Sequence, residues 1–166
     1  MANKTLLISP QVVEQYATFT KGLDANYVRP FIETAQDIRV QEVLGSKLLR
    51  RPQQMIDTNT LNDDYRELLE EHITPMLVWE TLAQMVIPTT YKLRNAGVVQ
   101  NYGEHIQTTT MSDANSLKND YETKSNFYQS RLLAFLHANH NRYPEFCKTD
   151  TCADMHSKEN YHIPLA

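Results

Sequence analysis

Apolar side chains recur every three to four residues along most of this chain, the spacing that places them on one face of an α-helix. A first short helix is predicted over residues 10–16, because Ser9 can cap it and Pro10 suits the first helical position. A second is predicted from Asn26, and Gly45 should end it by taking a left-handed conformation. Its buried face is predicted to hold Val28, Phe31, Ile32, Ala35, Ile38, Val43 and Leu44.

Two longer helices are predicted to form the core. Asn62 caps the more apolar one, over residues 63–87, in which Pro75 removes a backbone donor and should cause a kink near residues 71–75; Pro88 should mark its end. The other runs over residues 112–137 and should pack against it. Its apolar stripe is predicted to hold Leu117, Tyr121, Tyr128, Leu132, Phe135 and Leu136. A short helix carrying Leu48 and Leu49 and a surface connection over residues 52–61 precede this pair.

Two segments lack a helical period. Glycines and β-branched residues between Asn95 and Ser112 predict an extended loop or β-hairpin that projects from the core. The polar stretch from Cys147 predicts a C-terminal tail, whose last apolar residues suit an anchor on a neighbouring chain, with a frayed terminus as the alternative. The predicted fold is therefore an all-α helical bundle of four to five helices, with a connector domain over residues 1–146 and an extended tail over residues 147–166.

Composition narrows the class of protein. The 166 residues are 41% hydrophobic, which excludes a wholly disordered chain, and two cysteines are too few for a disulfide scaffold. A net charge of −4, from 16 Lys and Arg against 20 Asp and Glu, gives little overall attraction for nucleic-acid phosphates or an anionic membrane. No run of roughly 18 to 20 apolar residues is long enough to span a bilayer, and no secretory signal is recognisable. We expect a soluble protein made in a cytoplasm.

Motifs for catalysis or nucleotide binding are missing from the sequence. The four glycines cannot form a phosphate-binding loop, and neither a zinc-protease nor a serine-nucleophile motif occurs. The best candidate metal ligands are late in the chain: His137, His140, Cys147, Cys152, His156 and His162. The two cysteines are poorly spaced for zinc, so free thiols and surface histidines are the preferred interpretation, and a disulfide between them is disfavoured in a reducing compartment. We therefore expect no cofactor, no metal and no enzymatic activity.

Several charged and apolar groups have simple structural explanations. The pair Asp63 and Asp64 complements a helix dipole, and Glu70 and Glu71 should lie on a solvated face. The basic cluster of Lys47, Arg50 and Arg51 is explained by a solvated helix end. The alternative is a contact with phosphate or with an acidic partner. Core packing explains the spacing of Met76, Trp79 and Met85.

The order of features resembles a known protein family. An Ile-Ser-Pro opening is followed by Tyr27-Val28-Arg29-Pro30-Phe31-Ile32-Glu33-Thr34-Ala35-Gln36-Asp37-Ile38, then by Val43-Leu44-Gly45 and a long apolar helix with an internal proline. The last helix closes with Leu132-Leu133-Ala134-Phe135-Leu136 and Asn141-Arg142-Tyr143-Pro144-Glu145-Phe146. Over residues 7–146 this order resembles the head–tail connector (adaptor) proteins of tailed bacteriophages, in particular the portal-proximal neck ring protein of crAss-like and Bacteroides phages.

The resemblance implies a structural virion protein of the neck, made in the host bacterial cytoplasm. Such a subunit forms a homo-oligomeric ring, usually twelve-fold, beneath the portal protein; it contacts other neck or tail proteins and lets DNA pass through its lumen without specific binding. Contacts with these partners are expected from the excursion and the tail, at Val98, Val99, Tyr102, Ile106, Tyr161, Ile163 and Leu165. Two alternatives stay open: a cytosolic assembly factor or binding module outside the virion, and a metal-dependent enzyme that uses the late His/Cys cluster.

Overall fold

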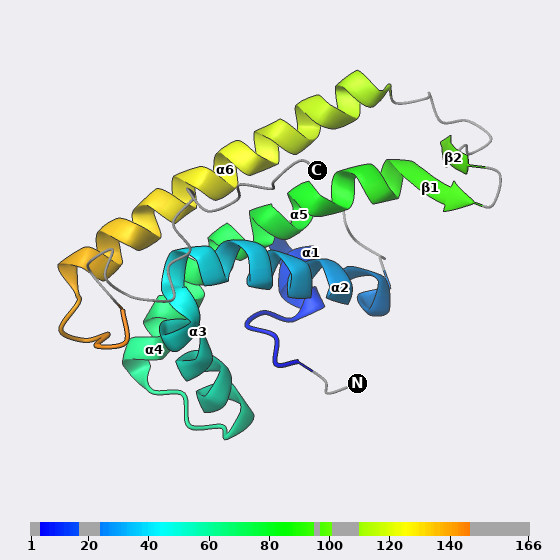
Figure 1. Cartoon of the computed structure of the whole chain (residues 1–166). Coiled ribbons are helices and arrows are strands. Elements are labelled where there is room, and N and C mark those ends of the chain that lie inside the picture. Colours follow the sequence, from blue (N-terminus) through cyan, green and yellow to red (C-terminus); the bar gives the residue numbers. More distant parts are fainter. Residues whose placement is uncertain (1–3, 17–23, 95–96, 101–109, 147–166) are drawn as a thin grey trace, which may run out of the picture.

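Two long helices that lie side by side form the centre of the fold (Figure 1). They are α5, Thr74–Thr90, and α6, Met111–Ala138, and their pairing confirms the predicted packing of the two longest helices. The computed structural model describes residues 4–16, 24–94, 97–100 and 110–146. Within these residues the chain is all-α apart from one short strand pair, in agreement with the predicted fold class.

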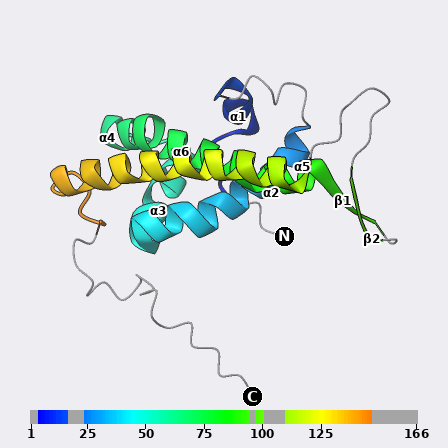
Figure 2. The ribbon, with the colours of Figure 1, turned by 90° about the horizontal axis from the view of Figure 1, so that it is seen from above.

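The two central helices differ in how much of their surface is covered. Buried residues occur all around α5: Thr74, Pro75, Met76, Leu77, Val78, Thr81, Leu82, Ala83, Met85 and Val86. A narrower stripe is buried on α6: Ala114, Tyr121, Ser125, Leu132 and Leu136. Helices therefore surround α5, whereas much of α6 lies at the surface. In Figure 2, α1 and α4 lie to one side of α6, and α2 and α3 lie to the other.

The N-terminal half bends at Gly45. Helix α1, Pro10–Tyr16, has its predicted bounds, and α2, Ala25–Ala35, begins at Asp24, whose side chain accepts from the Asn26 N–H. A π-helical turn, η2, Gln36–Val40, leads into α3, Gln41–Asp57. Gly45 has the predicted positive φ, 71°, but its ψ of 161° lies in a region almost exclusive to glycine rather than in the left-handed helical region. The chain turns there and then resumes a helix.

The predicted surface connection over residues 52–61 is wrong for its first half, because α3 continues to Asp57. Leu48, Leu49 and Pro52 are all buried on this helix. Their burial against the core outweighs the poor helix propensity of proline and of the polar residues that follow it.

The predicted irregularity before Pro75 is a π-helical turn. Asn62 caps α4, Asp63–Glu67, as predicted, by accepting from the Tyr65 N–H at 3.0 Å. The π-helical turn η3, Leu68–Ile73, then joins α4 to α5. The Leu69 carbonyl accepts from both the backbone N–H and the hydroxyl of Thr74, the latter at 2.7 Å. Pro88 does not end α5, which continues to Thr90 because the hydroxyls of its last two residues donate to carbonyls one turn earlier.

A loop after α6 closes one end of the bundle. Tyr143 is fully buried, and its hydroxyl donates to the Asp64 carbonyl at 2.9 Å. Arg142 donates to the carboxylates of Asp64 and Glu67, each at 2.5 Å. These contacts fasten residues 139–146 to α4, so the folded core extends to the end of the described chain.

A short antiparallel strand pair follows α5. Strand β1, Tyr91–Arg94, pairs with β2, Gly97–Gln100, with Tyr91 opposite Gln100. The pair extends away from the helices (Figure 1). The rest of the predicted excursion, and the whole predicted tail over residues 147–166, lie outside the described residues. No helix in the described part of the chain combines the length and the apolar character that a bilayer span requires.

Candidate functional site

Some large apolar side chains lie exposed on helices that bury most of theirs. Among the described residues these are Tyr16, Tyr27, Ile38, Met111, Leu117 and Phe127. Ile38 and Leu117 were predicted to face the core, and both predictions are wrong. The π-helical turn changes the angle between successive residues, which turns Ile38 away from the face that holds Ile32 and Ala35. Two groups of these side chains form patches.

The first group, called the α2 patch here, consists of Tyr27, Phe31 and Ile38. A spacing of four residues places Tyr27 and Phe31 on the same side of α2, and Ile38 follows on η2. The Tyr27 and Phe31 rings meet edge to face with centroids 5.5 Å apart. Ile38 is 60% exposed, whereas Phe31 is partly buried against the core. Exposed apolar clusters of this kind are typical of protein contact surfaces.

The second group, called the α6 patch here, consists of Phe127 and Tyr128 with the cations Lys124 and Arg131. Phe127 is 59% exposed, and its ring meets that of Tyr128 edge to face at 5.4 Å. The Arg131 guanidinium lies 5.8 Å from the Tyr128 ring centroid. The Lys124 ammonium lies 4.6 Å from the ring centroid of Trp79 on α5. Aromatic and arginine side chains are the groups enriched at protein interfaces.

The two patches lie on different helices of the subunit. The Ser125 hydroxyl donates to Glu80 on α5 at 3.0 Å, and the next residue, Asn126, accepts from Arg39 on η2. Each step along an α-helix turns the side chain by about 100°. Phe127 therefore points away from both α5 and η2. Ile38 lies on η2. One subunit thus presents two separate apolar patches.

Charged residues of opposite sign flank the patches. Asp37 and Glu42 lie beside Ile38, and the subunit's own cations Lys4 and Arg39 contact them. Lys124 and Arg131 lie beside Phe127, and Lys124 also pairs with Asp120 at 2.6 Å. Both acidic groups and Lys124 therefore already have partners within the subunit.

The contact residues predicted from the resemblance are only partly within the described chain. Val98 and Val99 lie on β2, opposite Leu93 and Lys92. The other predicted contact residues lie outside the described residues: Tyr102, Ile106, Tyr161, Ile163 and Leu165.

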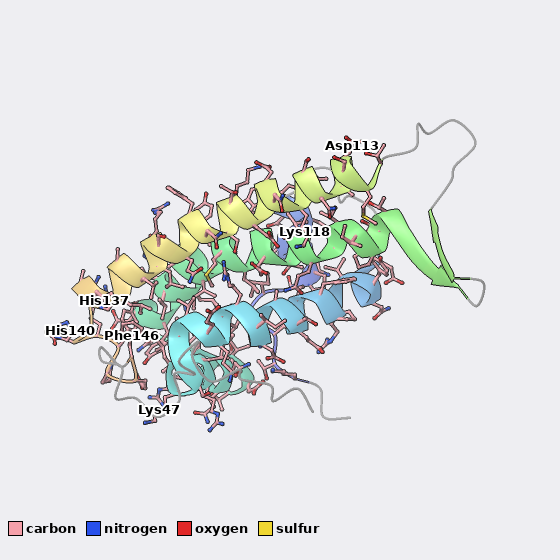
Figure 3. The ribbon with its side chains drawn as sticks, turned by 45° about the horizontal axis from the view of Figure 1, so that its top comes forward. Lys47, Asp113, Lys118, His137, His140 and Phe146 are labelled. Atoms are coloured by element: carbon pink, nitrogen blue, oxygen red, sulfur yellow. The ribbon has the colours of Figure 1, made fainter. Side chains whose placement is uncertain are left out.

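The late His/Cys cluster is also only partly described. His137 and His140 lie at the same end of α6, where Figure 3 also shows Phe146. The exposed His137 ring meets the Phe146 ring edge to face at 5.4 Å. Cys147, Cys152, His156 and His162 lie outside the described residues, so the predicted alternative of a zinc site stays untested.

The predicted solvated charges are exposed, with two additional contacts. Glu70, Glu71, Lys47 and Arg50 lie at the surface as predicted. Arg51 lies 3.7 Å from Glu145 of the C-terminal loop, and Asp64 binds Arg142 as well as complementing the helix dipole. Met76 and Met85 are buried, which confirms their packing role, whereas Trp79 is half-buried and faces Lys124.

Sequence reasoning missed Phe127. This residue lies off the buried stripe of its helix, and a large aromatic residue at such a position is the signal that could have identified the patch.

Comparison with protein families assigns the chain to one of them. Residues 40–155 match the model of a family of unknown function (DUF6712). The chain belongs to this family. The matched region contains the α6 patch, whereas Tyr27, Phe31 and Ile38 precede it. No curated protein and no solved structure matches the chain.

Proposed function

We propose that this DUF6712 protein is a structural virion protein: a subunit of a ring beneath the portal that joins the capsid to the tail of a bacteriophage. The proposal rests on the resemblance of the element order over residues 7–146 to head–tail connectors. The protein acts by non-covalent docking and is not an enzyme. Its partners are further copies of itself, the portal protein and other neck or tail proteins.

The observation that carries the proposal is the presence of two exposed apolar patches on different helices. A two-fold dimer uses one self-complementary patch, whereas head-to-tail contacts join two different patches and close into a ring when the rotation allows it. The α2 patch of one copy meets the α6 patch of the next, so Ile38 contacts Phe127. Twelve copies form the ring.

The excursion and the tail extend this design. The excursion carries Val98, Val99, Tyr102 and Ile106 towards the portal, and the tail anchors on a neighbouring chain. Tail contacts come from Tyr161, Ile163 and Leu165. DNA passes through the lumen without specific binding, because a subunit with a net charge of −4 offers few fixed phosphate contacts.

Electron microscopy of the purified protein, alone and mixed with the portal protein of the same genome, tests the proposal. We expect rings stacked on the portal. Phe127→Asp should abolish the rings, because it removes the aromatic ring from each subunit contact and requires a carboxylate to be desolvated there. Asn119→Asp adds the same charge at an exposed position of α6 outside the patch and should leave the rings intact.

Two results would contradict the proposal. Monomers in both samples, together with absence of the protein from purified virions, would favour a cytosolic assembly factor. Rings that form equally well with Phe127→Asp would show that the α6 patch is not the contact between subunits.

A further inference from the structure

The π-helical turn η3 brings together Glu67 and His72, two side chains that an ordinary α-helix would separate. Residues five apart in an α-helix lie about 140° apart around the axis, whereas a π-helical turn, with its hydrogen bonds between residues five apart, places them nearly in line. Glu67 and His72 are related in this way across Leu68–Ile73. One ligand atom from each of Glu67, Glu71 and His72 lies within 4.8 Å of the other two.

His72 has an imidazole nitrogen with no protein partner. Its Nδ1 is shielded from solvent and makes no hydrogen bond within the described part of the chain. The ring stacks on Phe135 with centroids 3.8 Å apart and an interplanar angle of 21°, which fixes its orientation. A metal binds the neutral imidazole through one of its ring nitrogens.

The two carboxylates differ in mobility. Glu67 is held by Arg142, which donates to its Oε2 at 2.5 Å, and no hydrogen bond to its Oε1 is seen among the described residues. A carboxylate oriented by a neighbouring donor is the arrangement that supports metal ligands in proteins. Glu71 is exposed, so its side chain can rotate towards the other two without disturbing the core.

We propose that Glu67, Glu71 and His72 form a three-ligand site for a divalent transition-metal cation of the zinc class. Two carboxylate oxygens and one imidazole nitrogen are donors that zinc accepts at about 2.0 to 2.2 Å, with water completing the tetrahedron. Such a tetrahedron has ligand atoms roughly 3.4 Å apart, so binding draws the three side chains closer than in the metal-free structure. The cation would fasten the π-helical turn and, through Arg142 on Glu67, the C-terminal loop.

The site is independent of the proposed ring function, because none of its ligands belongs to either patch. It is also distinct from the late His/Cys cluster considered from the sequence. Arg131 and Arg142 place positive charge nearby, which weakens cation binding, so we expect a dissociation constant in the micromolar range.

Calorimetric titration of the metal-free full-length protein with Zn²⁺ tests this site. The starting protein carries Cys147→Ser and Cys152→Ser, so that the thiols of the tail do not bind the probe. We expect one equivalent of bound Zn²⁺ and a higher melting temperature. Glu71→Ala in this background should abolish stoichiometric binding, and Glu70→Ala, a change of the neighbouring exposed glutamate, should leave it intact.

A second probe keeps the result unambiguous. Co²⁺ bound in place of Zn²⁺ should give the weak visible absorption of nitrogen and oxygen coordination, and His72→Gln should remove it. Absence of one-to-one binding at mid-micromolar Zn²⁺ would overturn the proposal. Binding that survives both Glu71→Ala and His72→Gln would also overturn it, because the ligands would then lie elsewhere in the chain.

Discussion

The side-chain amide of Gln36 pairs with the backbone of Leu7, 29 residues earlier in the chain. The Leu7 N–H donates to Gln36 Oε1 at 2.9 Å, and Gln36 Nε2 donates to the Thr5 carbonyl at 3.2 Å. Gln36 is fully buried at the start of the π-helical turn η2, so its amide acts as the hydrogen-bonding partner of an extended N-terminal segment. Leu7 and Ile8 of this segment are buried in the core as a result.

Gln36→Met should destabilise the protein by about 1 to 3 kcal/mol, because it leaves the buried Leu7 N–H without a partner. The Thr5 carbonyl would keep a second donor, Gln53 Nε2, at 3.2 Å. Urea unfolding measures the free energy of unfolding, and Gln41→Met, at an exposed position, serves as the control. Equal effects of the two substitutions would show that the amide pairing contributes nothing.

Leu77→Ala should cost about 2 to 5 kcal/mol, because Leu77 is fully buried on α5 and its truncation leaves a cavity. Leu117→Ala on α6 makes the same chemical change at a side chain that is 45% exposed, and it should alter stability by no more than about 0.5 kcal/mol. Thermal and urea unfolding of both variants check this difference. Comparable losses would mean that Leu117 is covered in the isolated protein.

Gly45→Ala should cost about 1 to 3 kcal/mol through backbone strain alone. Gly45 has a φ of 71° and a ψ of 161°, and apart from its chain neighbours and the nearby backbone of its own helix no heavy atom lies within 4 Å of the position that a Cβ would take. The substitution therefore introduces no clash and isolates the conformational cost. Ser46→Ala at the next position should have a much smaller effect on the free energy of unfolding. A neutral Gly45→Ala variant would show that the bend relaxes freely.

Acid should destabilise the metal-free protein partly through His72. Burial lowers the pKa of His72 below its ordinary value of 6.5, so the unfolded chain binds a proton more readily than the folded one as the pH falls below 6.5. Stability from this group is complete above pH 6.5 and is lost towards the lower pKa of the folded state. His72→Gln should reduce the difference in urea midpoint between about pH 7.5 and about pH 5.

A His72→Gln variant with the parent's full pH dependence would assign the acid sensitivity to other groups.

Local patterns were sufficient for the parts of the fold that neighbouring residues control. The α1 helix over Pro10–Tyr16 and the Asn62 cap follow from capping chemistry within a few positions. The pairing of the two long helices follows from their apolar periodicity, since such faces must be buried against another element. The positive φ of Gly45 follows from the residue type alone.

Tertiary contacts decided the rest. Periodicity identifies residues that share a helix face, but it does not say how far the neighbouring elements cover that face, so Ile38 and Leu117 could not be recognised as exposed. Helix α3 continues through Pro52 because distant core residues cover it. The π-helical turn η2 accompanies a buried glutamine whose partners lie about 30 residues away, and η3 aligns Glu67 with His72, an alignment that the α-helical period does not provide.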